Sequence, residues 1–170
     1  MAAYNLIATT TVGSGGSSAI TFTSIPATYT DLLVVVSLRN DTTADQFYMT
    51  LNSITFGSGT ANSSKIVYGD GSNPNSRNNV PYLGFPSASD YTASVFSNAS
   101  MYIPNYTGST NKSVSTDSVN ENNASTAYLS LSAAVFNIAA AITIVSIETQ
   151  SIAVKFLQYS SASLYGIKNS

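Results

Sequence analysis

The sequence contains no cysteine and no histidine. Without cysteine the chain can form neither a disulfide nor a thiolate metal site. Without histidine it lacks the commonest general base and the commonest metal ligand of proteins, so a serine–histidine–aspartate triad is excluded. These absences argue against an enzyme, and we expect the chain to work without catalytic residues or a cofactor.

Charge is also scarce. Only 8% of the residues are charged, about a third of the usual share, and the net charge is −2. The basic residues are scattered singly, so no patch can neutralise a row of phosphates, and we expect no nucleic-acid partner. Weak charge leaves little electrostatic repulsion against close contact between protein surfaces.

Export and membrane signals are missing as well. Residues Met1–Asn5 lack the basic start and apolar core of a signal peptide. The most apolar stretch, Ala133–Ile147, is interrupted by polar residues and is shorter than the about 20 residues that a bilayer span needs. We therefore expect a soluble protein, made in the cytoplasm, with no membrane partner.

The residues that are abundant favour strands. Ser (29), Thr (19) and Asn (16) make up 64 of the 170 residues, while 44% of the chain is hydrophobic. Serine and asparagine compete with helix backbone bonds, and threonine is β-branched, so this composition disfavours long helices. The apolar share is enough for a packed core.

Turn residues separate twelve short β-rich runs, which predict about ten strands at spacings typical of an all-β domain. The runs are Tyr4–Val12, Ala19–Ile25, Asp31–Arg39, Phe47–Phe56, Lys65–Tyr68, Tyr82–Phe85, Ala93–Ile103, Lys112–Val119, Ala127–Phe136, Ala141–Thr149, Ile152–Leu157 and Ser163–Ile167. The range Gly57–Arg77 is otherwise rich in loop residues. No helical stripe alternates with the runs, which disfavours an α/β fold.

Several runs carry a specific expectation. The apolar run Asp31–Arg39 predicts a central strand covered on both faces, and Phe47, Met49 and Leu51 are expected on one face of theirs. The spacing of valines in Lys112–Val119 predicts a bulge. Ala141–Thr149 and Ile152–Leu157 are expected to form a hairpin around Gln150 and Ser151.

We predict one domain, residues 1–170, with an all-β fold. Two antiparallel sheets pack face to face in a jelly-roll-like sandwich of about ten strands. A helix over Ala133–Ala141 is the main alternative, although the β-branched residues that follow argue against it.

Three kinds of chemical site are conceivable from the residues, and for each a structural role is expected instead. Asp117 and Glu121 are the best carboxylate pair, but at a strand end and turn their spacing is not expected to place them on one face. A serine–lysine pair needs a desolvated lysine, whereas Lys65 and Lys112 have polar neighbours in sequence. The stretches Asp41–Asp45 and Gly69–Asn73 offer oxygens for calcium, but an Asp-Gly pair usually marks a plain turn.

Aromatic residues are the remaining group of candidate functional residues, with eleven tyrosines and seven phenylalanines. Exposed rings stack on sugars or anchor interfaces, and Tyr102, Tyr106 and Tyr128 are candidates for that role. In a sandwich, however, most aromatic residues fill the core or its rim.

Three segments together resemble a family of small virion proteins of tailed bacteriophages, common among marine and cyanobacterial phages. They are Ser24–Arg39 (SIPATYTDLLVVVSLR), Tyr102–Asn123 (YIPNYTGSTNKSVSTDSVNENN) and Ser163–Lys168 (SLYGIK). The resemblance implies a β-sandwich that assembles on the particle, in the best-understood members as a capsid cement or decoration protein, often a trimer. It carries over no catalytic residues and leaves head or tail location open.

From this resemblance we expect a capsid-decorating protein on the virion surface whose partners are the major capsid protein and two further copies of itself. The candidate interface residues are Met1, Ala2, Ala3, Tyr4, Asp70, Arg77, Asn78, Tyr102 and Tyr106. A tail or head-fibre component that binds host-surface carbohydrate through exposed tyrosines is the first rival. A glycan hydrolase using Asp117 or Glu121 is the second.

Overall fold

The computed structural model describes residues 3–43, 46–55, 63–69, 74–78, 80, 82–122 and 127–168. At residues 55, 63, 78, 121 and 127 it describes the backbone only. These ranges contain thirteen strands and no helix. The prediction of an all-β chain is confirmed, and the alternative helix over Ala133–Ala141 is absent because strand geometry continues to Phe136. No helix of the described residues is long and apolar enough to cross a membrane.

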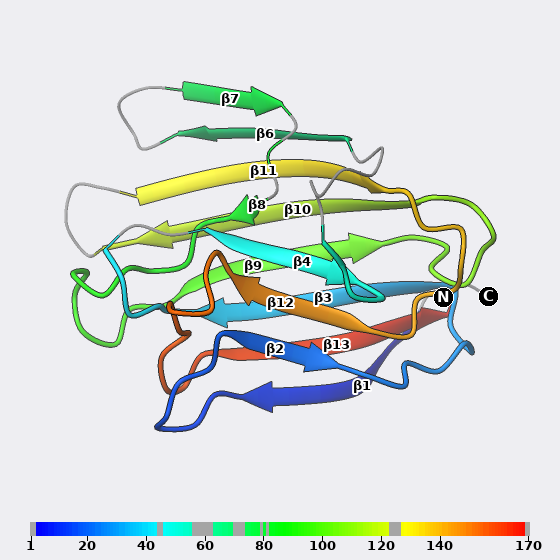
Figure 1. Cartoon of the computed structure of the whole chain (residues 1–170), viewed down its shortest axis with the longest axis horizontal. Coiled ribbons are helices and arrows are strands. Elements are labelled where there is room, and N and C mark those ends of the chain that lie inside the picture. The colour runs from blue at the N-terminus through cyan, green and yellow to red at the C-terminus, as the bar shows by residue number, and fades with distance from the viewer. Residues whose placement is uncertain are drawn as a thin grey trace.

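The strands form two antiparallel sheets packed face to face, with the smaller sheet in front of the larger one (Figure 1). In spatial order the larger sheet holds β1 (Ala3–Thr11), β13 (Ser161–Lys168), β3 (Asp31–Leu38), β9 (Ser97–Ile103), β10 (Lys112–Glu121), β11 (Ala127–Phe136), β6 (Ser63–Gly69) and β7 (Pro74–Asn78). The smaller sheet holds β2 (Ala19–Phe22), β12 (Val145–Thr149), β4 (Phe47–Leu51) and β5 (Ile54–Thr55), and β8 (Tyr82–Gly84) pairs with β4.

The chain alternates between the sheets as in a jelly roll. Strands β1, β13, β3 and β9 are neighbours in the larger sheet, while β2, β12, β4 and β8 are neighbours in the smaller one. Successive members of this set of eight therefore lie mostly in opposite sheets, which is the double Greek-key arrangement. The predicted jelly-roll-like sandwich is confirmed.

Four strands extend the larger sheet beyond the jelly roll. Strands β6 and β7 come from the connection between β4 and β8, and β10 and β11 come from the connection between β9 and β12. They pair in the order β9, β10, β11, β6, β7, so insertions far apart in sequence lie side by side at the upper end of the sheet in Figure 1.

The core lies between the two sheets. Leu32, Val34 and Val36 of β3 face Met49 of β4 and Ile147 of β12, and all five are at most 2% exposed. Phe47, Met49 and Leu51 are all fully buried, as their shared face predicts. The hydrophobic effect of closing this core is the main favourable term for the fold.

Beyond the core, the inner face of the extension is polar. Ser132 Oγ donates to the carbonyl of Leu83 at 2.9 Å, Ser64 Oγ to that of Val80 at 2.7 Å, and Asn120 Nδ2 to that of Pro86 at 3.2 Å. The segment that includes β8 thus covers β10, β11 and β6 through its backbone. Serine and asparagine side chains satisfy carbonyls that a leucine face would leave unpaired.

Two expectations about individual strands are wrong. β3 is central in its sheet, but only its inner face is covered, since Val35 on the other face is 39% exposed. β10 pairs in regular register with both neighbours and has no bulge. Val114 and Val119 simply point to opposite faces, because residues an odd number apart on a strand do so.

The predicted hairpin of Ala141–Thr149 with Ile152–Leu157 is also wrong. β12 pairs with β2 and β4, while residues 152–157 form no strand, and Phe156 makes isolated bridges to Ser17 and Asn40. The predicted run Phe47–Phe56 instead contains a hairpin between β4 and β5. Its turn residues, Asn52 and Ser53, have φ of 51° and 64°, as a tight two-residue turn requires.

Candidate docking surface

The side of the larger sheet that faces away from the smaller sheet, here called the outer face, has no layer over it among the described residues. Strand register places one row of side chains across it. In spatial order the row is Leu6, Tyr165, Leu33, Tyr102, Ser115, Ala133 and Lys65. Paired residues of an antiparallel ladder point to the same face, so this row and its neighbours define one continuous surface.

Large apolar side chains gather on the outer face. Ten are strongly exposed in the described part of the chain, and the register places eight of them here. They are Tyr4, Leu6, Val35, Val67, Tyr102, Leu129, Leu131 and Val135. Leu131 is 66% exposed and Tyr4 is 64% exposed. Exposed apolar surfaces of this kind are uncommon, and where they occur they usually mark a docking surface.

The leucines of β11 point outward, although its alternating pattern would also allow the leucine face to be buried. Along this strand Leu129, Leu131 and Ala133 alternate with serines, and the serines face inward. Ala134 and Phe136 share the serine face and lie in the core, which sets the register of the strand. As a result the leucines lie on the surface.

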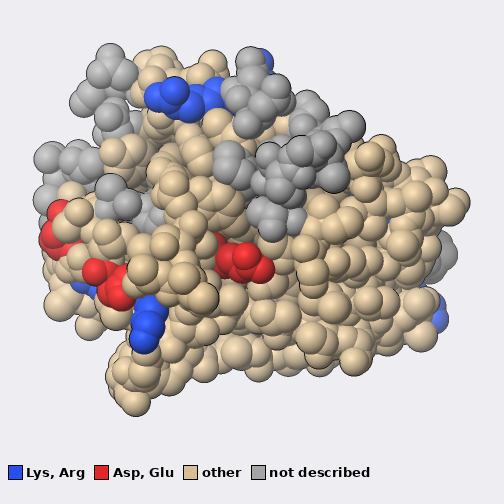
Figure 2. Space-filling view, in the orientation of Figure 1, with Lys and Arg blue, Asp and Glu red and all other residues tan. Residues whose placement is uncertain are grey.

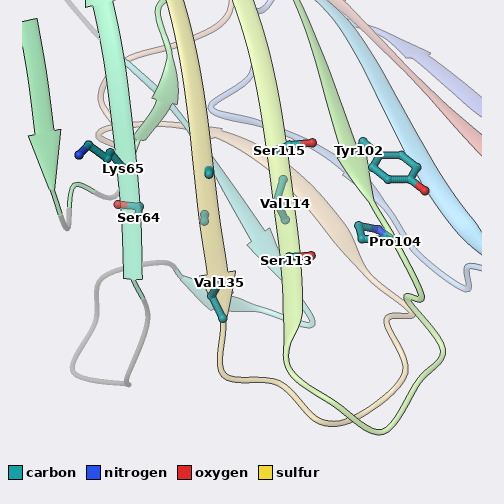
Figure 3. Close-up of a pocket in the computed structure, with 10 residues that line it drawn as sticks. Ser64, Lys65, Tyr102, Pro104, Ser113, Val114, Ser115 and Val135 are labelled. Atoms are coloured by element: carbon teal, nitrogen blue, oxygen red, sulfur yellow. The ribbon is translucent and has the colours of Figure 1, made fainter.

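The two largest of the three hollows that described residues form on the outer face have different linings. The larger, of about 780 Å³, lies over β6, β11, β10 and β9, and its lining includes Lys65, Tyr102 and Val135 (Figure 3). The second, of about 470 Å³, is here called the leucine groove and is lined by the apolar side chains of Val67, Val119, Leu129 and Leu131, together with Asp117 and others. A mostly apolar concave surface with a few polar groups suits the binding of a partner's side chains.

Tyr102 is held in place on this face. Its hydroxyl donates to Oδ2 of Asp31 at 2.7 Å, and the backbone N–H of Asn105 donates to the other oxygen, Oδ1, at 2.8 Å. The hydrogen bond to Asp31, followed by burial and the negative charge of Asp31, raises the pKa of Tyr102 to about 12. The phenol is therefore neutral at physiological pH, and its orientation is fixed by a charge-assisted bond.

Charge is sparse on the surface. Figure 2, which views the side of the smaller sheet, shows a few Lys, Arg, Asp and Glu residues on an otherwise neutral surface. Among the described side chains of the outer face, Asp31, Lys65 and Asp117 carry charge, and Asp117 accepts a hydrogen bond from Ser100 Oγ. Contact with this face therefore requires little removal of water from charged groups.

A separate aromatic cluster lies around Phe85. Ring centroids of Tyr68, Tyr82 and Tyr128 lie 5.3, 5.7 and 5.2 Å from that of Phe85, and the Tyr128 ring is stacked on it. A cavity of about 210 Å³ beside this cluster is also lined by Gln46, Tyr91 and Asn120. Burial raises the pKa of Tyr91. The cluster combines aromatic faces with amide and hydroxyl groups.

The candidate interface residues are distributed unevenly. Tyr4 and Tyr102 lie on the outer face, Ala3 is exposed on β1, and Arg77 is exposed on β7 at the opposite edge, where its Nε donates to Tyr68 Oη at 3.5 Å. Asn78 ends β7, and its side chain is not described. Met1, Ala2 and Asp70 lie outside the described residues, as do residues 71–73 of the stretch considered for calcium.

The expectation of an exposed Tyr106 is wrong. Its side chain is fully buried in the core, and its hydroxyl donates to the carbonyl of Pro26. Lys112 also differs from expectation, because its side chain is 1% exposed and its ammonium donates to the carbonyls of Gly108, Thr110 and Ile138. Burial lowers the pKa of Lys112, and the three carbonyls make it a structural clamp for a turn.

The expectation that Asp117 and Glu121 do not share a face is wrong. Both belong to β10 and are an even number of residues apart, so the backbone places them on one face after all. Four residues of strand separate them by about 13 Å, beyond the about 5 to 10 Å between paired glycosidase carboxylates. Among the described residues, no three His, Cys, Asp or Glu side chains cluster as metal ligands would.

Comparisons with protein-family models, curated proteins and solved structures found no match to this chain. The resemblance to phage virion proteins therefore stays a prediction from the sequence. The sequence analysis does not predict the outer face, because Leu6, Val67, Leu129 and Leu131 look like ordinary members of strands in the sequence. A usable signal was present in β11, where serines share the face of Phe136.

Proposed function

We propose that this chain is a structural protein of a phage particle, a capsid cement protein on the capsid surface that bridges neighbouring major capsid subunits. The observation that carries the proposal is the outer face, where eight large apolar side chains lie exposed on one rigid sheet. The three segments that resemble virion proteins supply the setting, and the resemblance also implies a homotrimer.

The physics of the outer face suits this role. Each exposed apolar side chain that a partner covers contributes about 25 cal/mol per Å² of buried area. Charges that would oppose desolvation are few, and the hydroxyl groups between the apolar side chains suit a partly wet contact. On a symmetric capsid, contacts that are weak one by one act together, because release of one copy requires all of them to break.

Copy number tests the location. Quantitative mass spectrometry of purified particles should find this chain in numbers comparable to those of the major capsid subunit, and imaging should place it over the seams between subunits. Particles that lack the chain contradict the proposal. Copies confined to the tail support the rival location.

Particle binding tests the surface. Tyr102→Ser together with Val135→Ser removes two apolar side chains from the larger hollow, and we expect it to reduce occupancy on capsids that lack the native protein. Tyr159→Ser is the matched control, because Tyr159 is 69% exposed and lies outside the strands of the outer face. Equal occupancy of both variants and the wild type would contradict docking through the outer face.

The rival function, carbohydrate binding by a tail or head fibre, is favoured by one observation, the cluster around Phe85. Aromatic rings beside amide and hydroxyl groups form the kind of site that stacks on a sugar face. Binding on a glycan array that disappears in Tyr128→Ala but persists in Tyr102→Ala would support this function in place of the first.

A further inference from the structure

One side of β1 is a free sheet edge. β1 ends the strand order of the larger sheet and pairs with β13, and in Figure 1 it lies at the lower margin of the molecule. Within the described part of the chain, no second strand pairs with its other side. A free edge presents a row of backbone donors and acceptors with which a further strand can pair.

The hydrogen bonds show which backbone groups face this free side. Val12 donates its N–H to the carbonyl of Ser160, just before β13, at 2.8 Å. Backbone groups alternate in direction along a strand, so those of Thr11 and Thr9 face away from β13. A hydrogen bond of 2.9 Å between the hydroxyls of Thr9 and Ser163 agrees, because side chains lie closest in pairs that share no backbone bonds.

The same holds beyond the β-bulge at Ile7, where the register of β1 against β13 shifts. Thr30 donates its N–H to the carbonyl of Ile167 at 2.8 Å, so that carbonyl faces the side of β3 rather than β1. Tyr4 pairs with Ile167, so the backbone groups of Tyr4, and those of Leu6 two residues along, also face the free side. Four residues of β1 thus present an N–H and a carbonyl each to a partner.

The other edge strands of the described residues are protected against pairing. β7 has five residues and includes Pro74 and Arg77, β2 has four residues and is followed by Pro26, and β5 and β8 have two and three residues. Short length, proline and charge are the usual means by which proteins protect an edge. β1 has nine residues, no proline and no charge, and its one irregularity is the bulge.

We propose that an extended segment of the major capsid subunit adds to the larger sheet as a ninth strand along the free edge of β1. The proposal deepens the proposed function and rests on it for the identity of the partner. In strand addition the main-chain hydrogen bonds supply the affinity. Tyr4 and Leu6 belong to the outer face as well as to the edge, so a subunit that covers the outer face also reaches this strand.

This chain itself provides a poor partner for the edge. The β1 of a second copy would bring its own bulge, so two such edges would pair regularly over no more than Ala3–Leu6 or Ala8–Thr11, four residues each. The remaining edges of the described residues are short or protected. A regular extended segment of another protein meets neither limit, and it removes no charged side chain of β1 from water.

Proline substitutions on the free side test the pairing. In Thr9→Pro and Thr11→Pro the ring replaces an N–H that faces away from β13, so the backbone bonds to β13 remain, but an incoming strand loses a donor and meets the ring. Thr9→Val and Thr11→Val are the matched controls, because they remove the same hydroxyls and keep the N–H groups. On purified capsids that lack the native protein, we expect each proline variant to bind at least about tenfold more weakly than its valine control.

Hydrogen exchange of the wild-type protein gives a second measurement, which does not depend on whether a variant folds. In the free protein the amides of Thr9 and Thr11 should exchange fast, whereas that of Thr10, which faces β13, should exchange slowly. On capsids the amides of Thr9 and Thr11 should exchange at least about tenfold more slowly than in the free protein. Circular dichroism and the urea midpoint establish which proline variants are folded.

Three results would overturn the inference. The first is a folded proline variant that binds capsids as tightly as its valine control, and the second is exchange at Thr9 and Thr11 that is equally fast on capsids and in solution. The third is protection of these amides in the purified protein alone, which would assign the edge to a second copy. Wild-type protein that does not bind capsids at all contradicts the proposed function, whereas these three results leave the capsid role standing.

Discussion

The orientation of β11 leads to the most decisive prediction, because it inverts the usual pattern of leucine inside and serine outside. Leu131 is 66% exposed, whereas Ser132 is 6% exposed and donates to the carbonyl of Leu83. Replacing each residue separately asks which of the two holds the fold together. We take Leu131→Ser and Ser132→Ala as the pair.

The expected magnitudes follow from burial. A fully buried leucine contributes about 1.5 to 3 kcal/mol, so Leu131→Ser, with two thirds of its side chain exposed, should cost less than about 1 kcal/mol. Ser132→Ala removes a buried hydrogen bond and should cost about 1 kcal/mol or slightly more, because a buried carbonyl loses its donor. Leu164→Ala, at a fully buried position, should cost about 2 to 5 kcal/mol and serves as the scale.

Urea unfolding provides the measurement. Circular dichroism and tyrosine fluorescence report on the transition, and the chain has eleven tyrosines and no tryptophan. Association adds to apparent stability, so each variant is measured at several protein concentrations and compared where the midpoint no longer depends on concentration. A cost above about 2 kcal/mol for Leu131→Ser, with none for Ser132→Ala, would show that the leucines face inward and would refute the reasoning about the outer face.

Three further predictions concern other parts of the molecule. The raised pKa of Tyr102 means that the folded state favours the neutral phenol. The stabilising effect of the neutral phenol is therefore complete below about pH 10 and disappears as the pH rises from there through about 12. Ultraviolet titration should show one tyrosine ionising near 12, and Asp31→Asn should lower that pKa. Gly84→Ala would place a Cβ 2.6 Å from Cε1 of Phe47, so we expect the free energy of unfolding to fall by about 1 to 3 kcal/mol, measured by thermal unfolding. An unchanged Tm would contradict the close packing of β8. Arg39 is only 8% exposed and donates to four backbone carbonyls of the 89–95 segment. We expect Arg39→Met to lower the free energy of unfolding by about 2 kcal/mol or more and to speed proteolysis within that segment. An unaltered cleavage pattern would show that the guanidinium does not organise the segment.

The sequence by itself determined the class of fold and the main face of the core. Scarce charge, abundant serine and threonine, and regularly spaced turn residues exclude helices in favour of strands. The alternation of Phe47, Met49 and Leu51 identified a buried face, because a period of two places all three on one side of a strand. Such local patterns depend on the residues of one strand and need no knowledge of its neighbours.

The tertiary structure alone decided which strands pair and which apolar side chains remain in contact with water. Leu129 and Leu131 alternate with serines, and the sequence hints at their direction only through Phe136, which shares the face of the serines. Their exposure was settled by Phe136 packing in the core and by the backbone of β8 lying over the serines. Tyr106 is a candidate exposed aromatic from the sequence, yet in the folded chain its ring is fully buried in the core. Burial is a property of the whole packed molecule, so contacts between residues far apart in the chain decide which apolar side chains are left exposed on the outer face.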